Sequence, residues 1–218
     1  MYPKLQIEYN QQGHYGLIDG EPIVSQQHHV IYAPNPSLIQ LLYEEICELK
    51  DKQGNQNDGV IFRMISRAID AYRNKITSSS IKELLEKDYY LKIQSKLSQD
   101  RSAHLFPVIT DIFESNGLEQ ARLEKLNKKH WKWISDQVKV TDYWERSFLL
   151  EMAQNGYLLL SLVFLNNHLT LPLYAEYCLL SGGANPEDAR KNHKDFITSH
   201  TKEFRYLRLV YNKIDPDQ

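Results

Sequence analysis

Two pairs of neighbouring carboxylates are the first residues in this sequence that could do acid–base chemistry. Glu44 and Glu45 fall in an apolar helical pattern, and Glu187 and Asp188 directly follow an Asn-Pro dipeptide. Paired carboxylates can divide the roles of general acid and general base. The first pair is explained as the solvated face of its helix, and the second as the acidic first turn that a helix dipole favours. Neither pair therefore requires an enzyme.

The histidines do not form a metal-binding pattern. The chain has eight, and none stands in the His-Glu-x-x-His or Glu-x-x-His spacing that places ligands on one face of a helix. His28 and His29 are adjacent, so as strand residues they would point to opposite faces. His193 and His200 lie seven residues apart, which is too far for one metal ion without a third element. We therefore predict no metal site.

The cysteines and glycines also lack a catalytic or phosphate-binding arrangement. Cys47 and Cys178 both fall in apolar helical patterns, which favours buried free thiols in a reducing compartment over a disulfide, a metal site or a nucleophile. Gly13, Gly16 and Gly20 lie in predicted β-turn regions and lack the following helix of a phosphate-binding loop. A Gly-x-Ser-x-Gly elbow is absent from the sequence. We predict that the protein uses no cofactor and is not an enzyme.

The composition is that of a globular protein with a real core. The chain has 218 residues, of which 42% are hydrophobic and 25% charged, so it forms one large domain or a small one attached to a medium one. A net charge of −2 lacks the basic excess usual in a nucleic-acid binder, so we predict no nucleic-acid partner. Fourteen tyrosines against seven phenylalanines suit half-buried positions and protein interfaces.

The elements that must position any site begin with a β-rich segment over residues 1–34. Leu5, Ile7 and Tyr9 alternate with polar residues, which is the pattern of a half-buried strand. Further short strands are predicted over residues 15–18, 22–24 and 30–32, with a tight turn at Asp19 and Gly20. Such a small meander is not stable alone, so it must pack on the helices that follow.

From residue 35 to residue 218 the pattern is helical. Asn35 and Asn185 each precede a proline, which is typical of an N-cap followed by the first helical residue. Ser80 and Glu83 form a capping box, and Thr141 is the predicted N-cap of a central helix. The predicted helices cover residues 36–49, 61–72, 80–91, 107–116, 118–140, 142–165, 172–181 and 186–212. We therefore predict an α+β fold, in which a small N-terminal antiparallel β meander packs on a larger all-helical domain.

The central helix is the most apolar part of the chain. Residues 157–165 are apolar on every face apart from Ser161, so protein or lipid must surround them. This run is well short of the roughly 18–20 residues that span a bilayer. We predict the core helix of a soluble domain without a transmembrane segment. The first residues, MYPKLQIEYNQQG, are typical of neither a signal peptide nor a transit peptide.

The order of motifs in the N-terminal third resembles the assembly-chaperone family that acts on the α subunit of the ATP synthase catalytic head. In that family a β-rich N-terminal piece carries a Leu-Asp-Gly turn, followed by a proline-led helix ending in Glu-Trp and by an Arg-Leu…Ala-Ile-Asp helix. The matching motifs here are Tyr2-Pro3-Lys4, the strand LQIEY, Leu17-Ile18-Asp19-Gly20-Glu21-Pro22, the strand over residues 30–32, Pro34 to Leu38, Glu44-Glu45, Arg63-Met64 and Ala68-Ile69-Asp70. In the second half, Leu105-Phe106-Pro107 resembles the family's Trp-Asp-Pro helix start, and the segment from Ser161 through Leu169-Thr170 to Ala175 resembles its closing helix pair.

The sequence also departs from the family pattern. Ser25 and Gln26 stand in place of a Thr-Pro, and Ile46 stands in place of the helix tryptophan. The family's acidic Asp-Glu group would fall near residues 181–183, where this chain has Ser-Gly-Gly. The nearest acids lie a few residues downstream, at Glu187, Asp188 and Asp195.

The resemblance implies a non-enzymatic chaperone that binds the unassembled α subunit. On this reading the protein is a monomer in the cytoplasm, or in the mitochondrial matrix if a transit peptide has been removed. The predicted partner-binding residues are the acids Glu187 and Asp188 and an exposed aromatic patch of Tyr177, Phe196, Phe204 and Tyr206. Core packing is the alternative explanation of the aromatic residues, because they recur at helical spacing.

Two other functions are compatible with the sequence. A helical-bundle enzyme or small-ligand-binding protein would have a deep pocket with converging polar groups, for instance His168, Tyr157 or Glu151. A pathogen or phage adaptor could share the architecture alone.

Overall fold

The computed structural model describes residues 3–71, 78–97, 101, 104–116, 123–166 and 169–211. The chain divides into two compact units. The first comprises Met1–Lys75, Asp142–Glu151 and Thr201–Asp217, and the second comprises Ile76–Thr141 and Met152–His200 together with Gln218.

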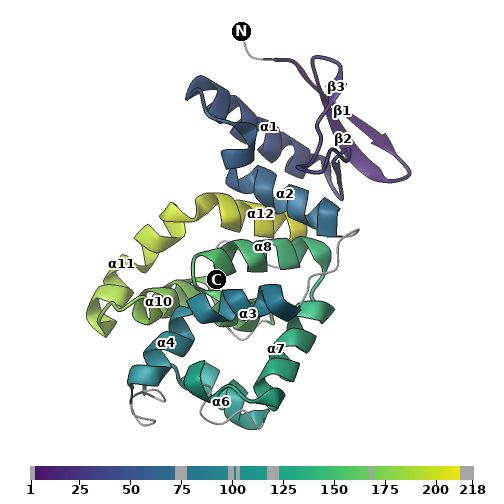
Figure 1. The fold of residues 1–218 in the computed structure, drawn as a ribbon. Helices are drawn as coiled ribbons and strands as arrows, with labels where there is room; N and C mark the ends of the chain where they lie inside the picture. The colour runs from purple at the N-terminus through teal and green to yellow at the C-terminus, as the bar shows by residue number, and fades with distance from the viewer. Residues whose placement is uncertain are drawn as a thin grey trace. The chain divides into compact units, whose positions relative to one another are not determined.

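A small antiparallel sheet forms the N-terminal part of the first unit (Figure 1). Its strands are β1 (Leu5–Asn10), β2 (Gly13–Ile18), β3 (Glu21–Pro22) and β4 (Tyr32–Ala33). β2 pairs with β1 along its whole length on one side, and with both β3 and β4 on the other. Together with the helices described below, this sheet confirms the predicted α+β fold.

Local sequence chemistry explains how the sheet turns and where it packs. Asp19 and Gly20 have φ values of +52° and +89°, so both central positions of this two-residue turn are left-handed, as a type I′ hairpin requires. Gly16 faces helix α1 (Pro36–Asp51) so closely that an added Cβ would lie 2.8 Å from Ile39 Cγ2. A glycine at this position therefore lets the sheet lie directly against the helix.

The helices of the first unit are α1, α2 (Val60–Ala71), α12 (Thr201–Tyr211) and the first nine residues of α8 (Tyr143–Gln154), with the short 3₁₀ helix η1 (Gln56–Asp58). Asn35 caps α1 as predicted, because its Oδ1 accepts the Leu38 N–H at 3.0 Å. The Asn35 amide also donates to the Leu209 carbonyl oxygen at 2.8 Å. This one side chain thus joins the start of α1 to α12.

The second unit is helical in the residues described. Its helices are α3 (Ser78–Lys87), α4 (Tyr89–Lys96), α6 (Pro107–Ser115), η2 (Leu123–Lys125), α7 (Lys128–Val140), α9 (Leu158–Leu165), α10 (Leu171–Ser181) and α11 (Pro186–Ser199). Every residue of α9 is buried, which confirms the prediction that this apolar run lies in the core. Among the described helices, none is long and apolar enough to cross a membrane.

Four of the predicted helices are each broken into two elements. The breaks fall at Asp88, Asn127, Gly156 and His200, and Ser80 lies inside α3 rather than capping it. Asp88 and Asn127 cap new helices, and Gly156 has a φ of +87°, which ends α8. Apolar periodicity continues across such breaks, so the predicted uninterrupted helices were wrong.

Thr141 is a second correction. It ends α7, where its hydroxyl donates to the Gln137 carbonyl oxygen at 2.8 Å. The side chain at the start of α8 is that of Asp142, whose Oδ1 accepts the Trp144 N–H at 2.8 Å. A carboxylate one residue later thus takes the role predicted for the threonine.

The change from β to α structure falls where it was predicted, between β4 and α1. The compact units follow a different boundary, because the sheet shares the first unit with α1, α2 and two later segments of the chain. A separate piece over residues 1–34 and a domain over residues 35–218 therefore stay predictions.

Candidate functional site

The acidic pair Glu187 and Asp188 lies in the first turn of α11, and both side chains are exposed. Asp188 has a structural task, because its N–H donates to Asn185 Oδ1 at 2.9 Å and its Oδ2 accepts the Asn185 amide at 2.6 Å. Among the described residues, no hydrogen bond or ion pair engages the Glu187 carboxylate. Glu187 is thus the acid of the pair that could meet a partner without loss of a cap.

The two acids are expected to differ in their effect on stability. Asp188→Ala removes half of the reciprocal cap and should lower the free energy of unfolding by about 1 kcal/mol. Glu187→Ala should change it by less than about 0.5 kcal/mol, as is usual for an exposed site. Urea unfolding of both variants checks this difference. Equal losses would contradict the structural role given to Asp188.

The four aromatic residues predicted as an exposed patch are buried. Tyr177 and Phe196 are each 6% exposed, Phe204 is 7% exposed and Tyr206 is 0% exposed. Their rings pack within their own units, and the Tyr206 hydroxyl donates to the Trp144 carbonyl oxygen at 3.1 Å. Core packing therefore accounts for all four, and a contact with a partner would require them to become exposed. Their role in partner binding stays a prediction.

The residues named for an alternative pocket are not found together in one described unit. His168 lies outside the described residues, and Tyr157 and Glu151 belong to different units. Glu151 is buried, and its carboxylate oxygens pair with Arg63 at 2.6 Å and Arg67 at 2.5 Å. Since both oxygens are taken by arginines, Glu151 holds α2 and α8 together in the first unit.

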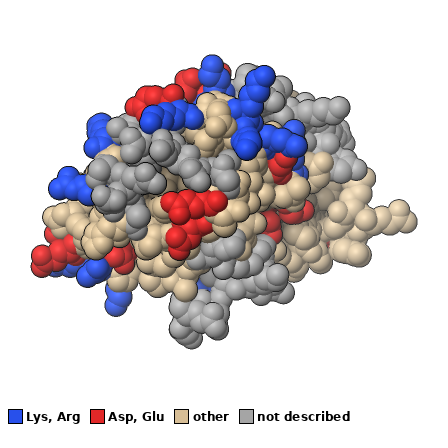
Figure 2. All heavy atoms as spheres, turned by 90° about the horizontal axis from the view of Figure 1, so that it is seen from below, with Lys and Arg blue, Asp and Glu red and all other residues tan. Residues whose placement is uncertain are grey.

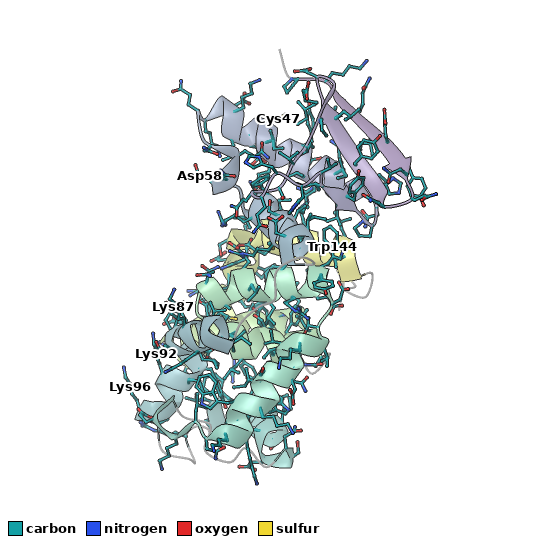
Figure 3. The ribbon with its side chains drawn as sticks, turned by 45° about the vertical axis from the view of Figure 1, so that its right-hand side comes forward. Cys47, Asp58, Lys87, Lys92, Lys96 and Trp144 are labelled. Carbon is teal, nitrogen blue, oxygen red and sulfur yellow. The ribbon has the colours of Figure 1, made fainter. Side chains whose placement is uncertain are left out.

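A cleft that the sequence analysis did not predict lies in the first unit. Its volume is about 730 Å³, which falls in the usual range for ligand pockets. The lining residues come from the β-rich segment, α2 and the start of α8, where Figure 3 labels Trp144. They are Gln12, His28, His29, Val30, Tyr32, Ala33, Pro34, Ala68, Ile69, Tyr143 and Trp144.

A polar network orients one histidine at the edge of this cleft. The Asp70 carboxylate oxygen Oδ1 accepts the Ser25 hydroxyl at 2.7 Å and lies 2.9 Å from His29 Nδ1. Ser25 Oγ also accepts the His29 backbone N–H at 3.2 Å, so the loop and the carboxylate fix the imidazole together. Since the Ser25 hydroxyl is directed at Asp70 and not at the imidazole, the trio is not a nucleophile–base pair. The three contacts hold the loop and the His29 ring in place beside the cleft.

Asp70 and His29 are 41 residues apart in the sequence and meet only in the folded chain. No local sequence signal indicates this contact. In the sequence His29 stands out only by its neighbour His28, and two adjacent strand residues could not chelate one metal ion together. His28 has a φ of +61°, so the loop turns sharply at that point.

Charges of both signs are interspersed on the face that Figure 2 shows, where Lys and Arg lie among Asp and Glu. Among the described residues, no group of three or more His, Cys, Asp or Glu could hold a metal ion. The face in Figure 2 thus carries charges of both signs.

Comparison with known proteins places the fold. No protein-family model matches the sequence, and no curated protein matches it. The structure resembles Atp12 from Paracoccus denitrificans with a TM-score of 0.62 at 13% identity, covering 96% of this chain and 97% of that one. It resembles the Atu1473 protein from Agrobacterium tumefaciens with a TM-score of 0.61 at 16% identity, covering 96% of this chain and 85% of that one. The chain therefore has the fold of Atp12, and the resemblance to the assembly chaperones seen in its sequence is confirmed at the level of the fold.

Proposed function

We propose that this protein is an assembly chaperone of ATP synthase that binds the unassembled α subunit of the catalytic head. The observation that carries the proposal is the likeness to Atp12 across 96% of the chain. The ordered motifs of the N-terminal third support it independently. A chaperone of this kind covers a surface of its client until the proper neighbour arrives, so it acts without a catalytic group or a cofactor.

We propose Glu187 and Asp188 as the acidic contact with the client. Both are exposed at the N-terminus of α11, close in sequence to the place where the family's acidic group would fall. The protein acts as a monomer on this proposal. Its location is that of the unassembled subunit, in the cytoplasm or in the mitochondrial matrix.

Affinity capture tests the client and the acidic contact together. Tagged protein is recovered from a lysate of its own cells in which the α subunit is expressed unassembled, and bound chains are identified by mass spectrometry. The α subunit should be recovered with the wild-type chain and reduced about tenfold with the Glu187→Ala/Asp188→Ala double variant, since a charged contact contributes on the order of 1–2 kcal/mol.

Asp136→Ala is the matched control, because Asp136 is an exposed acid on α7 and carries no proposed role. If the double variant still recovers the α subunit, the proposed client stands, but Glu187 and Asp188 are not the contact. Failure to recover the α subunit with the wild-type chain would refute the proposed function.

A further inference from the structure

The outer edge of β1 is a strand edge with which no described residue pairs. β1 pairs with β2 over the whole of Leu5–Asn10, without a bulge. The other side of β2 is already occupied by β3 and β4. The sheet therefore ends at β1 in the part of the chain that the structure describes (Figure 1).

The register identifies the backbone groups that face outward. The Gly16 carbonyl oxygen accepts the Ile23 N–H at 2.9 Å, so the Gly16 backbone bonds away from β1. Ile7 stands opposite Gly16, and the two therefore form a non-hydrogen-bonded pair. By alternation, the N–H and C=O groups of Leu5, Ile7 and Tyr9 point away from β2. Consistently, the neighbouring Lys4 carbonyl oxygen points inward and accepts the Asp19 N–H at 3.1 Å.

Two exposed apolar side chains, those of Ile7 and Tyr9, lie along this edge of β1. Ile7 is 37% exposed and Tyr9 is 72% exposed, and both belong to the small set of large hydrophobic residues that the described surface exposes. The Tyr9 ring lies against the His14 ring of β2, with 4.9 Å between the ring centroids. Natural proteins usually protect an edge strand with charged side chains, a proline, a bulge or an inward-pointing charge. β1 has one charged residue, Glu8, on the face opposite to Ile7 and Tyr9, and it has no proline and no bulge.

We propose that β1 accepts an extended segment of a protein partner as an additional antiparallel strand. The outward N–H and C=O groups of a free strand edge can hydrogen-bond to the backbone of an added strand, which provides affinity. The apolar side chains beside the edge favour apolar residues in that added strand, which provides specificity. Lys4 and Glu8 lie on the opposite face of β1 from Ile7, with Gln6 between them. The segment that fits best therefore carries apolar residues opposite Leu5, Ile7 and Tyr9, an acidic residue opposite Lys4 and a basic residue opposite Glu8.

A second copy of the chain is the weaker occupant. Two β1 strands could place Lys4 opposite Glu8, but joining two six-residue strands is a small contact beside the roughly 1,200–2,000 Å² of stable interfaces. A client segment has no such requirement, because contacts elsewhere on the client can add to the affinity. The inference goes beyond the proposed function and does not depend on the client's identity.

A synthetic peptide tests the edge directly. The probe is a fluorescein-labelled Thr-Val-Lys-Val-Thr-Val-Glu-Thr peptide, which matches the charges and the apolar positions of β1 in antiparallel register. Fluorescence anisotropy should show saturable binding to the full chain. A peptide of the same sequence with N-methylated valines cannot donate to the edge, and its affinity should be at least about tenfold lower.

Variants of β1 distinguish backbone hydrogen bonding at the edge from non-specific hydrophobic binding. Ile7→Pro removes an outward N–H that the β1–β2 ladder does not use, and should lower the affinity for the probe about tenfold, whereas Ile7→Thr keeps the N–H and should lose less. Tyr9→Lys should also weaken binding, and Gln11→Lys, which places the same charge in the adjacent turn, should not. Far-UV circular dichroism confirms that each variant is folded.

Loss of binding in Ile7→Pro and with the N-methylated peptide, in folded variants, supports the proposal. Absence of probe binding to the wild-type chain, or equal binding by Ile7→Pro, would overturn it. Sedimentation that shows a dimer abolished by Tyr9→Lys would overturn it in favour of a second copy.

Discussion

Replacing Asp88 with alanine is expected to lower the free energy of unfolding by about 4 kcal/mol, which is the largest effect we predict for a single polar residue. Asp88 is 0% exposed, and its two carboxylate oxygens serve two helices. Oδ1 accepts the Leu91 N–H at 3.1 Å in the first turn of α4, and Oδ2 accepts the Leu159 N–H at 2.9 Å in the first turn of α9. The alanine variant leaves both buried donors without a partner, at roughly 1–3 kcal/mol each. Urea unfolding monitored by circular dichroism measures the loss.

Asp88→Asn is the matched variant, because it keeps the shape and one acceptor oxygen but directs an amide N–H₂ at one of the two donors. Its loss should fall below that of the alanine variant. A loss below about 1 kcal/mol in the alanine variant would contradict the double-capping role.

Asp88 should also make stability depend on pH. Burial raises its pKa from the ordinary 3.8 to about 6, and the hydrogen bonds from backbone N–H groups oppose that rise. Because the folded chain then binds the proton more tightly than the unfolded chain, stability from this group is full below about pH 4 and is lost as the pH rises through about 6. The free energy of unfolding of Asp88→Ala should lack this fall, which amounts to up to about 3 kcal/mol. The same slope in both proteins would contradict the assignment.

Replacing Glu151 with alanine is the second large effect, and should lower the free energy of unfolding by about 3 kcal/mol. The Glu151 side chain is 6% exposed and pairs with Arg63 and Arg67, whose side chains are 30% and 27% exposed. Its removal leaves two half-buried guanidinium groups of α2 without their carboxylate. The hydrogen bond to Glu151 raises the pKa of Arg63 in the wild-type chain. Without Glu151 both guanidinium groups stay charged, because arginine keeps its proton in proteins, and Arg63 retains its hydrogen bond to the Asp58 carbonyl oxygen at 2.7 Å.

Glu176→Ala is the control for this prediction. Glu176 pairs with Arg190 at 3.3 Å, and the Arg190 side chain is 75% exposed, so the loss should stay within about 0.5 kcal/mol. Equal effects of the two glutamate variants would show that burial does not distinguish the two ion pairs.

Features of the fold that depend on neighbouring residues could be predicted from the sequence. The turn at Asp19 and Gly20 and the caps at Asn35 and Asn185 are such cases, because each is set within a few residues. The break at Gly156 is equally local, because Asn155-Gly156 is a helix-ending signal, but it lies inside an apolar run whose periodicity predicts one continuous helix.

The candidate site was less predictable, because it depends on what the folded chain brings together. Helical spacing could not separate core from interface for Tyr177, Phe196, Phe204 and Tyr206, since both environments favour the same residues. At the edge of the cleft, His29 of the loop after β3 contacts Asp70 of α2, which lies 41 residues away in the sequence. Asp88 can likewise cap both α4 and α9 only because the N-termini of these two helices lie side by side in the folded chain.

Direct binding of the purified chain to the purified, unassembled ATP synthase α subunit tests the central claim. Size-exclusion chromatography with light scattering should show a stoichiometric complex, and the assembled catalytic head should not bind the chain, because its subunit neighbours cover the surface that a chaperone holds. Absence of a complex with the folded, unassembled α subunit would contradict the chaperone function, and would leave the likeness to Atp12 as one of fold alone.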